Sequence, residues 1–176
     1  LETLTVHDLL KAQIKTYEIQ GLLAIENSLN QNGIDHVLLV KIATAGVCTG
    51  LLGGTIDQII SALSHAFLDG GTLRAYRHGT TTGPRKSWAA GDASSRGLWL
   101  AHLAIRSEVG YPTVLTAPQW GFQDVFLKGA TLRLPVVLGS YVAENILFKV
   151  SFPAEFHGQT AVESALALRP EIIGKI

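Results

Sequence analysis

The chain has 176 residues, of which 47% are hydrophobic and only 16% are charged. A chain of this length can bury a core without disulfides or metals, and its apolar share excludes an intrinsically disordered protein. Lysine plus arginine number 14 and aspartate plus glutamate also number 14, so there is no global basic field to hold nucleic acid or an anionic membrane. We therefore expect neither nucleic acid nor a membrane as a partner.

The cysteine content excludes several kinds of metal site and cofactor in these residues. Cys48 is the single cysteine, so these residues cannot form an internal disulfide, a thiolate zinc site or a cysteine-ligated iron–sulfur cluster. We expect no metal and no cofactor. The sequence contains no methionine, which favours a processed chain or a piece of a longer protein. Because Glu2, His7 and Asp8 interrupt any apolar run at the start, we expect no targeting segment in these residues.

The first part of the chain has the residue spacing of helices. Apolar residues at helical intervals predict a helix within residues 4–30, and a stretch rich in Ala and Gly predicts a buried helix at 36–52. Lys41 and several glycines interrupt this apolar stretch, which argues against a membrane span. Thr55-Ile-Asp-Gln58 has the pattern of a capping box and predicts a helix over about 56–68.

Glycine and proline divide the middle of the chain. A loop is predicted over residues 70–84, followed by a helix over about 86–107. Thr116-Ala-Pro118 is expected to begin a short helix, with the proline near its first turn. The pattern lacks an alternation of strand and helix, so the fold class is predicted to be mostly α.

The end of the chain has a different character. Segment 140–149 is ambiguous, and residues 151–156 are expected to be extended. A last helix is predicted to begin at His157 or Gly158 and to end at about Leu168.

The strongest chemical signal lies in residues 74–87, which we call the basic segment. Four permanent cations and one histidine fall within 13 residues, with no acidic residue among them: Arg74, Arg77, His78, Arg85 and Lys86. Lys86 and Ser87 fall at the expected start of a helix, where unpaired N–H groups and a positive partial charge favour an anion. The basic segment therefore predicts a site for carboxylate or phosphate, with a solvated basic loop as the alternative.

Two residues outside the basic segment leave alternatives open. His36 lies at the start of the predicted buried helix, where it is either a functional group or a cap or core histidine. Lys149 stands between Phe148 and Val150. A lysine in such an apolar frame either extends its ammonium group to solvent or is held at a site.

Six short strings occur along the chain: Tyr17-Glu-Ile-Gln-Gly21, Asp35-His-Val-Leu-Leu-Val-Lys41, Arg85-Lys-Ser-Trp-Ala-Ala-Gly-Asp-Ala93, Gly110-Tyr-Pro112, Gly139-Ser-Tyr141 and Phe148-Lys-Val-Ser-Phe-Pro-Ala-Glu-Phe-His157. In this order they resemble the MmgE/PrpD family, whose subunits are much longer and pair a large helical domain with a smaller α+β lid domain. The resemblance implies that residues 1–145 are the middle and end of the helical domain. Residues 146–176 would then cross into the lid.

The resemblance also implies a reaction. Family enzymes of this kind remove water from 2-methylcitrate to give 2-methyl-cis-aconitate, a hydro-lyase step of propionate breakdown in the methylcitrate cycle. A tricarboxylate substrate requires cations, which the basic segment supplies, and the elimination requires a base and an acid. The single cysteine of these residues cannot hold an iron–sulfur cluster, and the resemblance implies that side chains carry the reaction.

The family motifs map onto individual residues. Lys86 and Lys149 match two lysines of the family, one in the cleft and one near the lid crossing, and His36 matches a cleft histidine. These three residues are the catalytic candidates. The basic segment supplies the candidates for substrate binding, which are Arg85, His78, Ser87 and Arg77.

The same residues are compatible with two other functions. A decarboxylase or isomerase of a related tricarboxylate would use similar residues, and a helical packing module would have no activity. The apolar excess predicts a homodimer, because an isolated chain of this composition would expose an apolar patch. The expected location is the mitochondrial matrix if the source is eukaryotic, which we favour, and the cytoplasm if it is bacterial.

Overall fold

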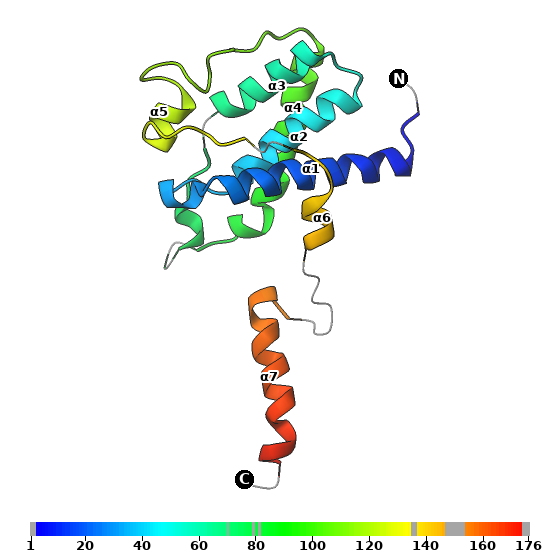
Figure 1. The fold of residues 1–176 in the computed structure, drawn as a ribbon, viewed down its shortest axis with the longest axis vertical. Helices are drawn as coiled ribbons and strands as arrows, with labels where there is room; N and C mark the ends of the chain where they lie inside the picture. Colours follow the sequence, from blue (N-terminus) through cyan, green and yellow to red (C-terminus); the bar gives the residue numbers. More distant parts are fainter. Residues whose placement is uncertain are drawn as a thin grey trace. The chain divides into compact units, whose positions relative to one another are not determined.

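The computed structural model describes residues 3–69, 71–78, 80, 82–134, 137–146 and 154–173 (Figure 1). The chain divides into two compact units, Leu1–Glu144 and Asn145–Ile176. The domain border that the sequence predicts, between residues 145 and 146, stays a prediction. The assignment of the second unit to a lid domain stays a prediction.

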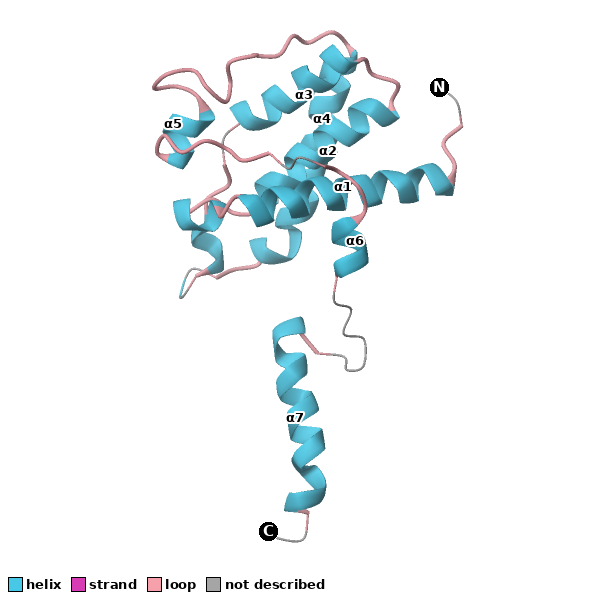
Figure 2. Cartoon of the chain, viewed as in Figure 1, coloured by secondary structure: helices cyan, strands magenta, loops and turns pink. Residues whose placement is uncertain are grey.

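Helices account for the regular structure of the described residues. The first unit contains α1 (Val6–Glu26), α2 (Val37–Leu51), α3 (Ile56–Leu68), α4 (Arg85–Ile105), α5 (Phe122–Leu127) and most of α6 (Tyr141–Asn145). It also contains two 3-10 turns, η1 (Leu29–Asn32) and η2 (Arg74–Arg77), while α7 (Phe156–Ile172) lies in the second unit. The described residues form no strand, only an isolated antiparallel bridge between Ile34 and Leu73 (Figure 2). The prediction of a mostly α fold is confirmed.

The long helices follow the sequence pattern closely. The expected capping box at the start of α3 is present, with the Thr55 N–H donating to Gln58 Oε1 at 2.9 Å and the Gln58 N–H donating to Thr55 Oγ1 at 3.3 Å. The predicted loop after α3 contains η2, and α4 begins at Arg85, one residue before its expected start.

Two predictions about the later elements were wrong. No helix begins at Pro118: Gln119 has a left-handed backbone with φ of 67°, and α5 starts only after Gly121. The last helix continues past Leu168 to Ile172. The extended structure expected at residues 151–153 lies outside the described residues.

Helix α2 is the centre of the first unit, where α1, α3 and α4 all contact it. Leu38, Ile42 and Ala45 of α2 are buried in the main apolar core, together with Ala62 of α3 and Leu100 of α4. The apolar composition of α2 is explained by this position, because neighbours cover it on several sides.

Helices α2 and α4 run side by side in the same direction. Val37 at the start of α2 packs against Ala89 and Ala93 in the first half of α4. Further along, Gly97 of α4 lies against the backbone carbonyl of Lys41. The N-terminal ends of both helices therefore lie at the same end of the first unit, and each contributes a positive partial charge there.

A buried carboxylate joins α1 to the segment that leads into α6. Glu18 is only 2% exposed, and its two oxygens accept the N–H groups of Gly139 at 3.1 Å and Val142 at 2.8 Å. Gly21, one turn later, lies directly beneath the Val142 side chain. Two of the strings that carry the family resemblance, Tyr17–Gly21 and Gly139–Tyr141, are thus structural partners.

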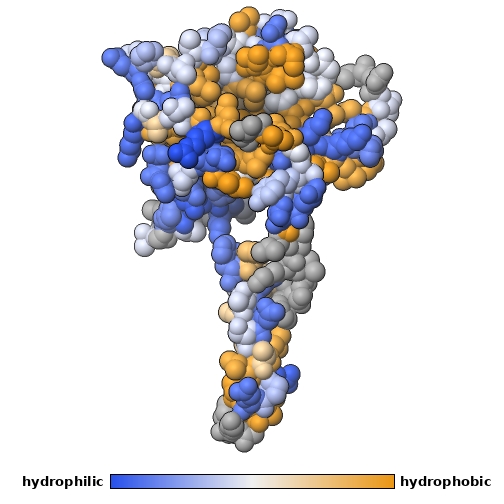
Figure 3. Space-filling view, viewed as in Figure 1, coloured by the Kyte–Doolittle hydropathy of each residue, from blue (hydrophilic) through white to orange (hydrophobic). Residues whose placement is uncertain are grey.

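The surface of the first unit retains many apolar side chains. Figure 3 shows them gathered on the face in view, and the exposed fraction reaches 83% for Trp120 and 77% for Val109. Among the described helices, none combines the length and the apolar character required to cross a bilayer.

Candidate active site

Backbone hydrogen bonds attach Thr72, just before the basic segment, and Arg74, its first residue, to the residues just before α2. The Asp35 N–H donates to the Thr72 carbonyl at 2.7 Å, and the Arg74 N–H donates to the Gly33 carbonyl at 2.9 Å. Gly33 has a left-handed φ of 75°, which a glycine adopts without strain and which turns the chain from η1 toward α2. Residues 72–74 are therefore fixed beside residues 33–35, next to the N-terminal ends of α2 and α4.

Asp35 is the anchor of this arrangement. Its carboxylate is fully buried, with Oδ1 accepting the Val37 N–H at 3.1 Å and Oδ2 accepting the Nε–H of Arg77. Burial alone would raise the pKa of Asp35, but the hydrogen bonds from Arg77 and Val37 outweigh it and lower the pKa. Asp35 is therefore ionised in the folded protein. Burial and the neighbouring Asp35 carboxylate raise the pKa of the Tyr76 phenol.

Acidic residues from elsewhere in the chain neutralise two cations of the basic segment. Arg77 is paired with Asp35. Arg85 donates from Nη2 to Asp92 Oδ2 at 3.0 Å, and its guanidinium lies over the Trp88 ring at 4.4 Å from the centroid. The sequence showed no acid within the segment, yet the fold brings these two carboxylates to it.

Arg74 brings two histidines together. Its Nη1 lies 3.3 Å from His36 Nδ1 and donates to Asn30 Oδ1 at 3.0 Å, while its Nε donates to His78 Nε2 at 3.2 Å. Burial lowers the pKa of His36, and the nearby Arg77 and Arg74 lower it further, while Asp35 acts in the opposite direction. The structure therefore places His36 and His78 at one cationic cluster, while the functional roles expected for them stay predictions.

Lys86 and Ser87 occupy the first turn of α4. Their backbone N–H groups donate to the carbonyls of Gly83 at 3.3 Å and Pro84 at 3.0 Å, and the Ser87 hydroxyl donates to the Pro84 carbonyl at 2.7 Å. These donors are thus already engaged within the turn. The Lys86 residue is exposed, so its ammonium is the group of this turn best placed to meet an anion. Lys149, the remaining catalytic candidate, lies outside the described residues.

Sequence reasoning missed a second charged cluster at the beginning of the loop. Asp69, which ends α3, accepts two hydrogen bonds from Arg96 of α4, at 2.8 Å and 3.3 Å, and lies 3.8 Å from Lys41 Nζ of α2. The hydrogen bond from Arg96 lowers the pKa of Asp69, whereas burial lowers the pKa of Lys41. The only signal in the sequence was a lysine inside an apolar helix.

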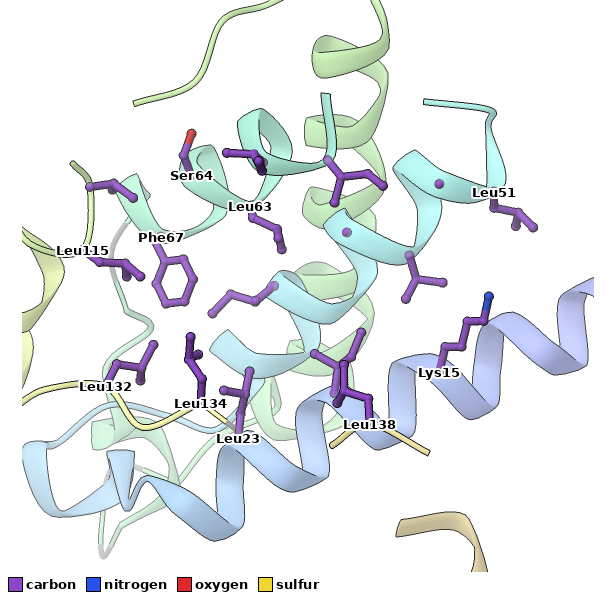
Figure 4. A pocket seen from close by; sticks show the side chains of 18 of the residues that line it. Lys15, Leu23, Leu51, Leu63, Ser64, Phe67, Leu115, Leu132, Leu134 and Leu138 are labelled. Carbon is purple, nitrogen blue, oxygen red and sulfur yellow. The ribbon is translucent and has the colours of Figure 1, made fainter. Parts of the chain in front are cut away.

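A separate cavity of about 830 Å³ opens between α1, the C-terminal half of α2, α3, residues 111–115 and the side chains of Leu132, Leu134 and Leu138. Figure 4 shows that leucines and Phe67 from these elements point into it, with Lys15 at its margin. An apolar lining of this kind does not suit a tricarboxylate, because it offers few partners for charged oxygens. The basic segment, at the other end of α2, is the better candidate. Within the described residues no group of three or more potential ligands could hold a metal ion.

Comparison with known proteins identifies the chain's family. The profile of the MmgE/PrpD N-terminal domain matches residues 1–135. The chain belongs to the MmgE/PrpD family.

The similar curated proteins come from bacteria and fungi. The chain is 57% identical over 165 residues to the 2-methylcitrate dehydratase of Escherichia coli K12, covering 94% of this chain and 34% of that protein. It is 55% identical over 167 residues to the mitochondrial 2-methylcitrate dehydratase of Yarrowia lipolytica, covering 95% of this chain and 32% of that protein. The chain thus spans about a third of the length of the curated relatives it matches.

Proposed function

We propose that the full-length protein containing these residues removes water from 2-methylcitrate to give 2-methyl-cis-aconitate, a step of propionate breakdown in the methylcitrate cycle. The observation that carries the proposal is the identity of 55–57% over more than nine-tenths of this chain to proteins named 2-methylcitrate dehydratase. The local chemistry of the basic segment supports it.

The positive end of the first unit suits a substrate with three carboxylates. Among the ion pairs of the described residues, none joins Arg74 or Lys86 to a carboxylate. The N-terminal ends of α2 and α4 add positive partial charge at the same place. Arg85 and His78 flank these cations and are proposed to bind substrate oxygens. Arg77 is proposed to act indirectly, by fixing the segment through Asp35.

The proposed elimination balances with side chains alone. A base removes the proton from the carbon next to a carboxylate, the electron pair of that C–H bond forms the new double bond, and the C–O bond breaks. The leaving hydroxyl takes a proton and departs as water. We assign one proton transfer to Lys86 and the other to Lys149. Each proton transfer by a positioned side chain contributes about 10²–10⁴-fold to rate.

Substitution of Lys86 in the full-length protein tests the proposal. Lys86→Arg keeps the charge but does not release a proton at neutral pH. If Lys86 transfers a proton, turnover of 2-methylcitrate should fall by about 10²–10⁴-fold in Lys86→Arg and in Lys86→Ala. Lys11→Arg, an exposed change on α1, is the control and should leave turnover unchanged. Near-normal turnover in Lys86→Arg would remove the proton-transfer role and leave an electrostatic one.

Product analysis separates the alternative functions. The full-length protein should form 2-methyl-cis-aconitate from 2-methylcitrate and should release no carbon dioxide from cis-aconitate. Carbon dioxide release without dehydration would instead establish the decarboxylase. Rearrangement to an isomeric tricarboxylate would establish the isomerase, and inactivity on both substrates would support the packing module.

We also propose that the full-length protein is a homodimer. The apolar side chains on the surface of the first unit support a further interface, because soluble monomers rarely keep large exposed apolar patches. Light scattering should give twice the subunit mass, and a single subunit mass would contradict the proposal.

For location we propose the mitochondrial matrix in a eukaryotic source and the cytoplasm in a bacterial one, in line with the two kinds of relative. Cell fractionation tests it.

A further inference from the structure

Arg74 contacts two imidazole rings at once, through different nitrogens of its guanidinium group. Nη1 lies 3.3 Å from Nδ1 of His36, and Nε lies 3.2 Å from Nε2 of His78. A third contact, Nη1 to Asn30 Oδ1 at 3.0 Å, fixes the direction of the guanidinium plane. These contacts join η1, η2 and the start of α2.

The chemistry of arginine decides which imidazole nitrogens carry hydrogen. A guanidinium group donates hydrogen bonds and has no acceptor. Nδ1 of His36 and Nε2 of His78 must therefore accept. A neutral imidazole that accepts at Nδ1 carries its hydrogen on Nε2, and the reverse holds for the other ring. The two histidines should thus be opposite tautomers.

Asp35 is the competing neighbour of His36. Its Oδ1 lies 3.4 Å from His36 Nδ1 and would favour a hydrogen there. However, the hydrogen bonds that Asp35 accepts come from the Val37 N–H at this oxygen and from Arg77 at the other, whereas the contact with His36 is longer. Two permanent cations, Arg74 and Arg77, face the His36 ring together with this one carboxylate, and with burial they lower the pKa of His36. These surroundings favour a neutral ring over an imidazolium.

We propose that Arg74 is a positioning residue that holds His36 as the neutral Nε2–H tautomer, so that His36 offers a hydrogen-bond donor to an oxygen of the substrate. This role rests on the proposed dehydratase function. The proposed tautomer also excludes His36 as the base, because an Nε2 that already carries hydrogen cannot take a proton from the substrate. Proton transfer then falls to the lysines.

Nitrogen NMR of the full-length protein, labelled with ¹⁵N-histidine and free of substrate, tests the tautomers independently of activity. His36→Gln and His78→Gln identify the two sets of signals. The expected result at neutral pH is hydrogen on Nε2 of His36 and on Nδ1 of His78. The Nε2–H tautomer also predominates in free histidine. The Nδ1–H tautomer of His78 is therefore stronger evidence for an effect of Arg74 than the Nε2–H tautomer of His36. Hydrogen on Nδ1 of His36, or an imidazolium at neutral pH, would overturn the proposal.

Substitution of Arg74 tests whether this residue sets the tautomers. In Arg74→Gln, His78 should lose its preference for Nδ1–H, and the pKa of His36 should rise because a nearby cation is gone. Arg106→Gln removes a cation at the C-terminal end of α4 and should change neither ring. Unchanged His78 and His36 signals in Arg74→Gln would exclude the positioning role. If Arg74→Gln fails to fold by circular dichroism, the wild-type spectrum alone still decides the tautomers.

The role of His36 in the reaction is tested by two variants. His36→Gln keeps an N–H donor near the place of Nε2 but has no titratable proton, while His36→Leu has neither. A donor role predicts that His36→Gln stays within about 10-fold of wild-type kcat/KM and that His36→Leu loses about 10- to 150-fold, the range for a charge-assisted hydrogen bond. Equal losses in both variants would assign proton transfer to His36. If no variant, including wild type, dehydrates 2-methylcitrate, the proposed function fails while the NMR result stands.

Discussion

Gly97 of α4 lies in direct contact with the backbone of Lys41 in α2. A Cβ at position 97 would stand 2.7 Å from the Lys41 carbonyl oxygen and 2.8 Å from Cβ of Thr44. Both distances are shorter than any normal carbon contact, and a backbone carbonyl cannot move aside as a side-chain end can. The missing side chain of Gly97 is therefore what allows α2 and α4 to run in parallel and to bring their N-terminal ends together at the basic segment.

Replacing this glycine should separate the two helices. We expect Gly97→Ala to lower the free energy of unfolding by about 1–3 kcal/mol, the usual cost of overpacking a core. Gly91→Ala in the same helix is the matched control, because a Cβ there would meet nothing within 4 Å. That control should gain about 0.5–1 kcal/mol from the better helix propensity of alanine. Urea denaturation measures both, and equal effects would contradict the close-contact explanation.

We expect that both oxygens of the buried Glu18 carboxylate are needed to hold the N–H groups of Gly139 and Val142. In Glu18→Gln one carboxylate oxygen becomes an NH₂ group, which cannot accept the N–H of Gly139 or Val142. Leaving a buried donor without a partner costs about 1–3 kcal/mol. Hydrogen exchange should become faster at whichever of these two amides loses its acceptor, while Glu26→Gln, an exposed change on the same helix, should leave both protected. Unchanged exchange in Glu18→Gln would show that packing of Val142 on Gly21 alone holds the segment.

The Asp69–Arg96 pair should make stability depend on pH in a defined direction. The hydrogen bond from Arg96 lowers the pKa of Asp69 below its ordinary value of 3.8. A carboxyl with a lowered folded pKa stabilises the protein above pH 3.8, and this contribution is lost as the pH falls below that value. The difference in unfolding free energy between wild type and Arg96→Gln should thus be about 0.2–1 kcal/mol at neutral pH, as for a partly exposed pair, and shrink in acid.

Arg106→Gln is the control for this pH effect. It removes a cation from the end of α4, away from Asp69. The decrease of the unfolding free energy in acid should therefore be the same as in wild type. A constant difference between wild type and Arg96→Gln from pH 7 to pH 3 would show that Arg96 acts by packing rather than by its charge.

The sequence predicted the helices well because their signals are local. The Thr55–Gln58 capping box and the apolar spacing of residues 4–30 lie within a few residues of the structure they specify. The helix expected at Pro118 failed because a left-handed residue, Gln119, follows it, and single-residue backbone angles leave little trace in composition.

The candidate site was predictable only in part. The cations of residues 74–87 and the start of α4 could be read directly from the sequence. Their partners could not, because Asp35 and Arg77 are 42 positions apart and only the fold brings them together. The expected excess of charge was therefore too large: Asp35 neutralises Arg77, and Asp92 neutralises Arg85. Pairings of this kind require the tertiary structure.

Asp35 and Arg77 form a buried ion pair, in which the side chains are 0% and 15% exposed. Asp35→Asn keeps an oxygen for the Val37 N–H but leaves the Arg77 guanidinium without a counter-charge. Arg77→Met leaves the Asp35 carboxylate buried without one. Removing either partner of a buried ion pair costs about 3–5 kcal/mol, because the remaining charge is desolvated and uncompensated.

The double variant Asp35→Asn, Arg77→Met distinguishes the cost of an unpaired buried charge from the stabilisation that the ion pair itself provides. It contains no unpaired buried charge, so its loss of unfolding free energy should be smaller than the sum of the two single losses by at least about 1 kcal/mol. Additive losses would mean that each residue acts through its own packing. The same three variants should be compared for turnover of 2-methylcitrate. If the pair fixes Arg74 beside His36, the double variant should regain stability without regaining activity, because neutral side chains cannot restore the charged hydrogen bond between Arg77 and Asp35 that helps to hold η2 at the start of α2.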